Sequence, residues 1–286
     1  MAEASVPGDP SPVPRATRRV ALGVSYRGTA YKGWQSQAGG GTVQDRLEAA
    51  LSQFAACPVS VRCAGRTDAG VHGINQVVHL DTTLTRDTHS WVRGGNAFLP
   101  ADIAVQWAVE TTMAFHARNS ALGRRYAYIV LEAPVRPALE SHQVGWVYRP
   151  LNGLAMQAAA QHLLGEHDFT SFRSSQCQSP TPVKWLRDIQ VHRCQGMAGR
   201  AHSTYWRFDF EGKAFLHHMI RNIMGCLLAV GTGVREPIWV KEVLLARDRK
   251  MAAPTFSPNG LYFLGPTYDP QWGMPDHVPA MDWLPG

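Results

Sequence analysis

The stretch Gly65-Arg66-Thr67-Asp68-Ala69-Gly70-Val71-His72-Gly73 separates two segments in which apolar residues alternate, 59–64 and 74–80. Each alternation predicts a β-strand. The link between them is longer and more polar than a two-residue hairpin requires. Its glycines let a ligand approach the backbone closely, and the guanidinium of Arg66 would favour the ionised form of Asp68. A tight turn with a local Arg–Asp contact is one interpretation, but the length and polarity of the loop favour a functional role.

Outward from this loop, the first half of the chain predicts an alternation of strands and helices. A strand at 20–26 and a glycine-rich loop at 27–41 precede a helix at 43–54, which has a possible capping box in Thr42 and Asp45. The two strands that flank the central loop follow, then a helix at 86–94 and a strand at 103–109. This β-α-β-β-α-β order is the split βαβ arrangement of ferredoxin-like folds.

The second half repeats that order. We expect strands at 124–131, 186–192, 204–210 and 261–268, and helices at 154–164, 214–230 and 237–246. The sequence therefore predicts an α+β fold of two fused ferredoxin-like halves, 18–118 and 119–269, with a central, mostly antiparallel sheet and a basic cleft. The proline-rich segment 1–17 is expected to be a disordered tail, and 270–286 a C-terminal tail.

Composition restricts the class of protein. The net charge of +6 suits a polyanionic partner such as nucleic acid. Five cysteines without a Cys-x-x-Cys pair argue against a disulfide framework or zinc site and fit a reducing cytoplasm. The N-terminus is too proline-rich for a signal peptide, and the longest apolar run, 223–230, is too short to span a bilayer. We therefore expect a cytoplasmic protein without membrane contact.

Asp68 has no acidic neighbour in the sequence, so it fits a covalent nucleophile or an electrostatic stabiliser better than one of a pair of acids. A metal site is not expected. The adjacent His217 and His218 should point in different directions, and the chain has no His-x-x-x-His pattern.

Arg221 lies in 215–224, within a predicted helix that is apolar on nearly every side and hence buried. A buried guanidinium without a counter-ion is strongly destabilising. Arg221 therefore either faces an anion, such as a carboxylate or a phosphate, or extends to solvent at a helix end. The sequence pattern leaves both possibilities open.

Tyr126 belongs to Arg124-Arg125-Tyr126-Ala127-Tyr128, in which alternation places the two tyrosines on one face and Arg125 on the other. Basic residues beside exposed aromatic rings suit RNA, because stacking on a base contributes roughly 1–3 kcal/mol. A tyrosine pair that fills a core fits equally well. The stretch Tyr31-Lys32-Gly33-Trp34-Gln35 has the same two interpretations.

Together these stretches resemble the tRNA pseudouridine synthase A family from about Val20 to Tyr268. The most specific match is 63–73, and the segments 169–173, 215–222 and 260–262 follow in the family's order. The family's first motif is matched by Tyr26, Gly28, Tyr31, Gly33, Trp34 and Gln35. Arg27 departs from it, because the family usually carries Asp at that position.

The resemblance implies a role for each matched residue. Asp68 resembles the catalytic aspartate, Tyr126 the tyrosine that stacks on the target base, and Arg221 the basic partner of Asp68. Arg66 resembles the arginine that enters the RNA helix where the base leaves, and Leu261 the aliphatic residue of the pocket. Further candidates for substrate binding within the matched motifs are Thr67, His72 and Trp34.

The resemblance also implies an activity. The family is free of cofactors and metals, is usually homodimeric, and converts uridine to pseudouridine at tRNA positions 38 to 40 in the anticodon arm. The reaction breaks the bond from ribose C1′ to uracil N1 and rejoins the base through C5, so the nucleotide must be flipped out. Two other functions stay open: an RNA-binding protein without activity, and a carboxylate-nucleophile hydrolase, which normally carries a second acid.

Overall fold

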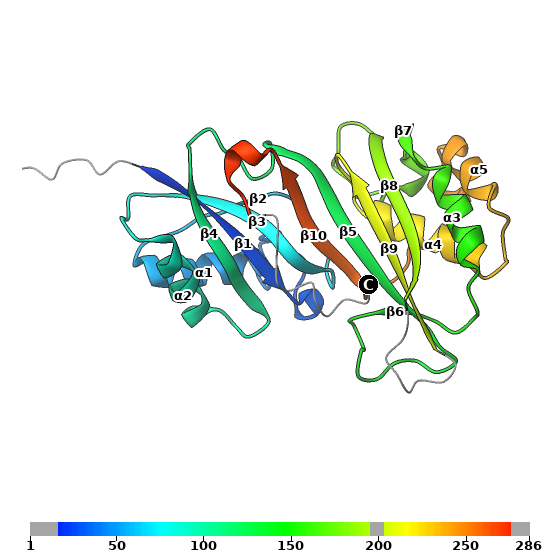
Figure 1. The fold of residues 1–286 in the computed structure, drawn as a ribbon, viewed down its shortest axis with the longest axis horizontal. Coiled ribbons are helices and arrows are strands. Elements are labelled where there is room, and N and C mark those ends of the chain that lie inside the picture. Colours follow the sequence, from blue (N-terminus) through cyan, green and yellow to red (C-terminus); the bar gives the residue numbers. More distant parts are fainter. Residues whose placement is uncertain (1–16, 195–202, 276–286) are drawn as a thin grey trace, which may run out of the picture.

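The computed structural model describes residues 17–194 and 203–275. Within them, ten strands form one sheet, in which eight run in the order β4-β1-β3-β10-β5-β9-β8-β7, while β2 pairs with β3 and β6 with β5. Helices gather near the two ends of this sheet and β10 runs through its middle (Figure 1). Most of the tail predicted at 1–17 and the end of the tail predicted at 270–286 lie outside the described residues. Among the described residues, no helix has the length and apolar character needed to cross a membrane.

The first half contains three long strands, one short strand and two α-helices. They are β1 (Arg18–Tyr26), α1 (Val43–Ala55), β2 (Arg62–Cys63), β3 (His72–Thr82), α2 (Thr88–Phe98) and β4 (Ile103–Thr111). The predicted capping box is present: the Thr42 hydroxyl accepts from Asp45 N, and the Asp45 carboxylate accepts from Thr42 N. Asp87 caps α2 through Ser90 N. Both helices thus begin where a side chain satisfies an unpaired backbone N–H group.

The second half repeats the pattern with additional short elements. Its elements are β5 (Ala121–Glu132), β6 (Gly145–Val147), α3 (Gly153–Gln161), β7 (Gly165–Asp168), β8 (Val183–Cys194), β9 (Thr204–Gly212), α4 (Met219–Gly231), α5 (Trp239–Ala246) and β10 (Leu261–Tyr268). Its principal strands lie in the order β10-β5-β9-β8, which matches β4-β1-β3-β2 in the first half. The prediction of two fused ferredoxin-like halves and a mostly antiparallel sheet is confirmed.

The halves join where β10 pairs with the start of β3. This contact is parallel, with Tyr262 opposite His72 and Phe263 opposite Gly73. The short β2 pairs only with His79 and Val78 of β3, so it leaves the first residues of β3 available to β10. A longer β2 would occupy the same edge of β3. The shortness of β2 therefore permits one continuous sheet.

Three sequence predictions need correction. The strand expected at 59–64 is reduced to the two residues of β2. The helix expected to begin at 214 begins at Met219, because His218 has a left-handed backbone (φ +63°) that a helix cannot contain. The short strands β6 and β7 were not predicted, since three or four residues carry too little alternation to reveal a strand.

Two hydrophobic cores lie on the same face of the sheet. One forms between α1, α2 and the strands of the first half and includes Tyr26; the other forms under α3, α4 and α5 and includes Leu261. Leu261 and Phe263 share a face because side chains alternate along a strand. Gly73 lies opposite Phe263, and a Cβ built at Gly73 would meet the ring of Tyr26. On this face, the junction of β3, β10 and β5 thus lies between the helices of the first half (α1 and α2) and those of the second half (α3, α4 and α5).

Candidate active site

The loop that carries Asp68 is fixed to the first half by several hydrogen bonds. Thr67 O accepts from Trp34 N at 3.0 Å, and the Thr67 hydroxyl bonds the Tyr26 hydroxyl at 2.8 Å. The amide of Gln76 bonds both the N–H and the carbonyl of Gly65. Strands β1 and β3 and the loop 27–41 therefore hold the loop that carries Asp68 in place.

Arg221, in the first turn of α4, pairs with Asp68. Its Nη1 donates to Asp68 Oδ2 at 3.2 Å, and its Nε donates to Phe256 O at 2.9 Å. The side chain of Arg221 is 14% exposed and that of Asp68 is 21% exposed. Of the two possibilities left by the sequence, the guanidinium faces an anion, and that anion is a carboxylate from the other half of the chain.

His217 and His218 both contact Asp68. His217 Nε2 lies 3.3 Å from Asp68 Oδ1, and His218 Nε2 lies 3.5 Å from Asp68 Oδ2. Their ring centroids are 3.9 Å apart. The expectation that these adjacent histidines point in different directions is therefore wrong. The left-handed backbone of His218 turns the second imidazole toward the same carboxylate as the first.

The electrostatic environment keeps Asp68 ionised. Burial raises the pKa of its carboxyl, but the hydrogen bond to His217 and the electrostatic influence of His218, His217 and Arg221 outweigh burial and leave the pKa below its ordinary value. Burial lowers the pKa of His218, although Asp68 acts in the opposite direction. A lowered pKa leaves His218 neutral at neutral pH, so Arg221 supplies the permanent positive charge beside the acid.

Tyr126 lies on the face of the sheet that the helices cover, opposite Phe263 of β10. Its ring packs edge-on against Phe215, with centroids 5.1 Å apart, and lies tilted 4.9 Å from Phe263. Burial raises the pKa of Tyr126, and the charge of Asp68 adds to the rise, so its hydroxyl stays protonated. As alternation predicted, Tyr128 shares its face and Arg125 lies exposed on the other. The rings of Tyr126, Phe215 and Phe263 thus form an aromatic surface near Asp68.

The remaining predicted residues differ in position. Arg66 is exposed beside Asp68 and its Nε donates to Gln35 Oε1 at 2.8 Å. Leu261 is buried in the core, opposite Tyr128 in the pairing of β10 with β5. Thr67 and Trp34 are also buried. Their contacts join the Asp68 loop to the loop 27–41, and neither side chain faces solvent.

His72 lies on the opposite face of the sheet from Asp68. Its ring stacks on Tyr262, with centroids 4.7 Å apart, and Tyr262 alternates with Leu261 and Phe263. Its Nδ1 accepts from Gly28 N and its Nε2 contacts His142 O at 2.8 Å. His72 lines a hollow of about 330 Å³ together with Arg27 and Asp102. The structure therefore does not bring His72 to the carboxylate.

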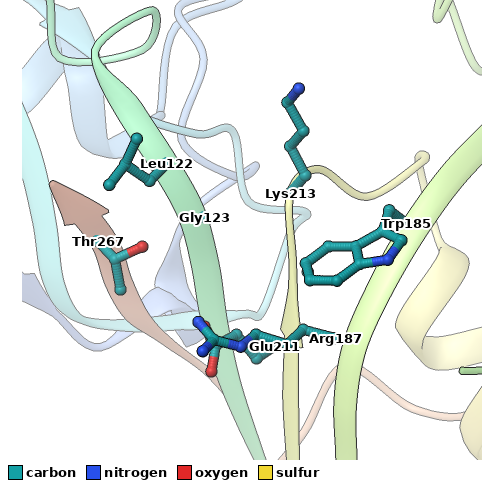
Figure 2. Close-up of a pocket in the computed structure, with 8 residues that line it drawn as sticks. Leu122, Gly123, Trp185, Arg187, Glu211, Lys213 and Thr267 are labelled. Atoms are coloured by element: carbon teal, nitrogen blue, oxygen red, sulfur yellow. The ribbon is translucent and has the colours of Figure 1, made fainter. Parts of the chain in front are cut away.

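A second hollow of about 180 Å³ lies at the ends of β5, β8 and β9 (Figure 2). The ring of Trp185 stands at one side of it, with Lys213 pointing away and Leu122 and Thr267 on the other side. Arg187 Nη1 donates to Glu211 Oε1 at 3.1 Å within it. None of the predicted site residues lines this hollow.

Four residues around Asp68 and Tyr126 were not predicted as site residues: Phe215, His217, His218 and Phe263. The first three lie in the same motif as Arg221, so proximity in the motif was an available signal. Phe263 follows Leu261 by two residues, and period-two alternation on a strand places both on one face.

A metal ion has one plausible donor set in the described part of the chain. One ligand atom each from Asp68, His217 and His218 lie within 4.8 Å of one another. Two imidazoles and a carboxylate are donors that zinc accepts. However, the guanidinium of Arg221 donates to the same carboxylate at 3.2 Å, and this positive charge opposes a cation there.

Comparison with known proteins identifies the family. The model of the tRNA pseudouridine synthase family matches residues 23–118 and 159–269, which include Asp68 and Arg221. The chain belongs to this family. Tyr126 lies between the two matched segments.

Relatives of this synthase family cover nearly the whole chain. A tRNA pseudouridine synthase A of Polaromonas sp. is 62% identical over 267 residues, covering 93% of this chain and 100% of that protein. Another, from Paracidovorax citrulli, is 63% identical over 277 residues with the same coverage. A crystal structure of a Cbf5–Nop10–Gar1 complex is 12% identical, covers 82% of this chain and 60% of that chain, and has a TM-score of 0.32. The resemblance stated from the motifs is confirmed at the level of the family.

Proposed function

We propose that this protein isomerises uridine to pseudouridine in the anticodon arm of tRNA, at tRNA positions 38 to 40, without cofactor or metal. The family and its relatives, about 60% identical over their full length, support conversion of uridine in tRNA. The motif resemblance supports the anticodon arm. The observation that carries the proposal is a partly buried, ionised Asp68 that is paired with Arg221 beside a half-buried tyrosine.

Asp68 is the proposed catalytic residue. A side chain that is 21% exposed is reachable by a flipped nucleotide yet largely shielded from water. The paired guanidinium keeps the carboxylate charged, so the acid can attack a carbon of the nucleotide or remove a proton from the ribose. Attack at C1′, attack at C6 and proton removal before glycal formation all use this same ionised oxygen.

Tyr126 is the proposed surface on which uracil turns. Once the bond from C1′ to N1 breaks, the free base must stay in the site while C5 replaces N1. The rings of Phe263 and Phe215 pack against Tyr126 and leave little freedom for its ring. A fixed flat surface allows a base to rotate in its plane while it remains stacked.

Arg66 is the proposed contact with the RNA stem. It is exposed two residues before the catalytic acid, and Gln35 fixes its Nε. A guanidinium can stack in, and hydrogen-bond within, the space that an everted base leaves. That exchange lowers the unstacking cost of a few kcal/mol that flipping requires.

The test uses tRNA transcripts labelled with tritium at uridine C5. Pseudouridine formation releases the C5 tritium, and mapping of the modified positions locates the product. We expect tritium release and pseudouridine within positions 38 to 40, and neither with Asp68→Asn. Free uracil among the products would indicate a hydrolase instead, and tRNA binding without tritium release by the wild-type protein would indicate a binding protein.

We also propose a homodimer in a reducing, cytoplasmic compartment. The motif resemblance supports the dimer, and five cysteines without a Cys-x-x-Cys pair are compatible with reducing conditions. Light scattering coupled to size-exclusion chromatography measures the mass in solution. A mass near that of a single 31.5 kDa chain across the working concentration range would contradict the dimer.

A further inference from the structure

The convergence of two adjacent imidazoles on Asp68 requires an unusual backbone. Side chains of neighbouring residues diverge by about 100° around a helix and point to opposite sides of a strand. Here His217 Nε2 and His218 Nε2 lie 3.3 and 3.5 Å from the two oxygens of one carboxylate. The left-handed conformation of His218 (φ +63°, ψ 4°) makes this possible.

Flanking hydrogen bonds hold that backbone in place. Ser174 N donates to His217 O at 3.0 Å, and Asn222 N donates to His218 O at 2.9 Å, which closes the first turn of α4. A left-handed conformation is unfavourable for a residue with a Cβ and persists where the surroundings impose it, commonly at functional sites. The direction of both imidazoles is therefore set by the backbone rather than by free rotation of the side chains.

The contacts divide between the two oxygens of Asp68. Arg221 and His218 contact Oδ2, whereas His217 alone among these three contacts Oδ1. A carboxylate held at one oxygen can rotate about its Cβ–Cγ bond, but contacts at both oxygens prevent this rotation. Arg221 thus supplies the charge and, together with His218, the contact at Oδ2, whereas His217 supplies the contact at Oδ1.

We propose that His217 and His218 are positioning residues that fix the rotation of the Asp68 carboxylate, one imidazole on each oxygen, so that it meets the nucleotide in a single orientation. The proposal rests on the proposed function, in which Asp68 reacts with uridine. The histidines themselves transfer no proton in it. Besides Asp68, the charged and titratable groups near the pair in the described part of the chain include Arg221 on α4, Arg249 after α5 and Cys177, whose thiol interacts with the His217 backbone. Tyr126 and Tyr128 on β5 lie near Asp68.

His218→Gly is the most direct test, because glycine accepts the left-handed backbone and removes only the imidazole. Loss of a group that orients a functional side chain typically costs about 10- to 100-fold in activity. We expect kcat for pseudouridine formation to fall toward the lower end of that range, because Arg221 still contacts Oδ2, while KM for tRNA changes less than about threefold. Added imidazole should restore part of kcat, since it can re-occupy the vacated space.

His142→Gly is the matched control. His142 also has a left-handed backbone (φ +70°) and is exposed, and its carbonyl contacts His72 on the opposite face of the sheet. We expect this variant to keep wild-type kcat. A fall in kcat equal to that of His218→Gly would contradict the proposal, because the effect would then come from the backbone change.

A second pair of variants covers the case in which His218→Gly fails to fold. His217→Gln retains a donor near the position of Nε2, whereas His217→Ala removes it. We expect His217→Ala to lower kcat more than His217→Gln, at equal melting temperature. Wild-type kcat in both His218→Gly and His217→Ala, or an activity loss that imidazole does not reverse and that follows melting temperature, would overturn the proposal. Absence of pseudouridine with the wild-type protein would instead overturn the proposed function.

Discussion

Asp68 is held by groups that lie more than a hundred residues away along the chain. Its partner Arg221 is 153 residues distant, and the two imidazoles come from the same segment as Arg221. The acid therefore acquires its low pKa only in the folded protein. Two consequences follow at the scale of single residues, one for the reaction and one for stability.

Asp68→Asn should abolish isomerisation and leave most of the binding affinity. The amide keeps the shape of the carboxylate but cannot attack carbon or accept a proton in the same way. We expect the dissociation constant for tRNA to change by less than about tenfold, or roughly 1.4 kcal/mol. Filter binding and tritium release measure the two quantities in parallel. A loss of binding as large as the loss of turnover would contradict the assigned role.

Arg221→Met should lower both activity and stability. The variant leaves Asp68 without its permanent counter-charge, at a cost of about 2 kcal/mol at neutral pH, below the ~3–5 kcal/mol for a fully buried pair because part of the acid is exposed. Thermal unfolding measures the change. An unaltered melting temperature together with unaltered turnover would argue against the pairing.

The pH dependence of that destabilisation has a definite sign. In the wild-type protein the Asp68 pKa is depressed, so its contribution to stability is present above the unfolded-state pKa and is lost as pH falls through the folded-state pKa. Without Arg221 the carboxyl pKa rises, and protonation on acidification neutralises the unpaired acid. We expect the difference in melting temperature between Arg221→Met and wild type to be largest at neutral pH and to shrink as pH falls through the ordinary range of a carboxyl pKa, about 4. A difference that grows on acidification would contradict this.

Resemblance named Asp68, Tyr126 and Arg221 as candidates and paired Arg221 with Asp68, but the residue pattern alone could not bring them together. Periodicity describes neighbours along one element, whereas the Asp68–Arg221 contact depends on how two halves of the chain join. The direction of His217 and His218 was predicted wrongly for a local reason: ideal helix geometry was assumed at a position where the backbone is left-handed. His72 matched the motif yet lies on the other face of the sheet.

At the scale of elements, the loop 27–41 supports the Asp68 loop. Gly33 has φ +91°, and a Cβ added there would lie 2.7 Å from Thr67 O. The neighbouring Trp34 N donates to that same carbonyl, and Val43 N donates to Gly33 O at the start of α1. The loop therefore connects the position of Asp68 to the first helix.

Gly33→Ala should reduce both melting temperature and kcat, because the methyl group displaces Thr67 and with it the adjacent Asp68. Gly233→Ala is the matched control: Gly233 also has a positive φ (+72°), but a Cβ there meets nothing within 4 Å. It lies beyond the C-terminal end of α4, whereas Arg221 lies in the first turn. We expect the control to lose stability without a fall in kcat. Equal kcat in the two variants would show that the Asp68 loop does not depend on Gly33.

Most long elements could be predicted from the sequence, since alternation and helical spacing persist over many residues in β1, β5, α1 and α5. Short elements could not be predicted, because their limits depend on contacts with distant segments of the chain. β2 is a two-residue strand whose limits depend on β10 occupying the rest of the β3 edge. That competition between distant segments leaves no local pattern in the sequence.

For the whole molecule, a net charge of +6 predicts a strong effect of salt on tRNA binding. Each phosphate that the protein neutralises releases counter-ions from the RNA. We expect affinity to fall by at least about tenfold between 50 and 200 mM salt, while sucrose at equal osmolality leaves it unchanged. A flat response to salt would contradict a basic binding surface.

The central position of β10 also determines when, during its synthesis, the protein becomes able to modify tRNA. This strand is the last of the sheet to leave the ribosome, yet it fits between β3 and β5, which emerge much earlier. Until it arrives, the backbone pairing that joins β3 to β5 through β10 is missing. We therefore expect nascent chains to be inert toward tRNA until β10 has emerged and paired with β3 and β5.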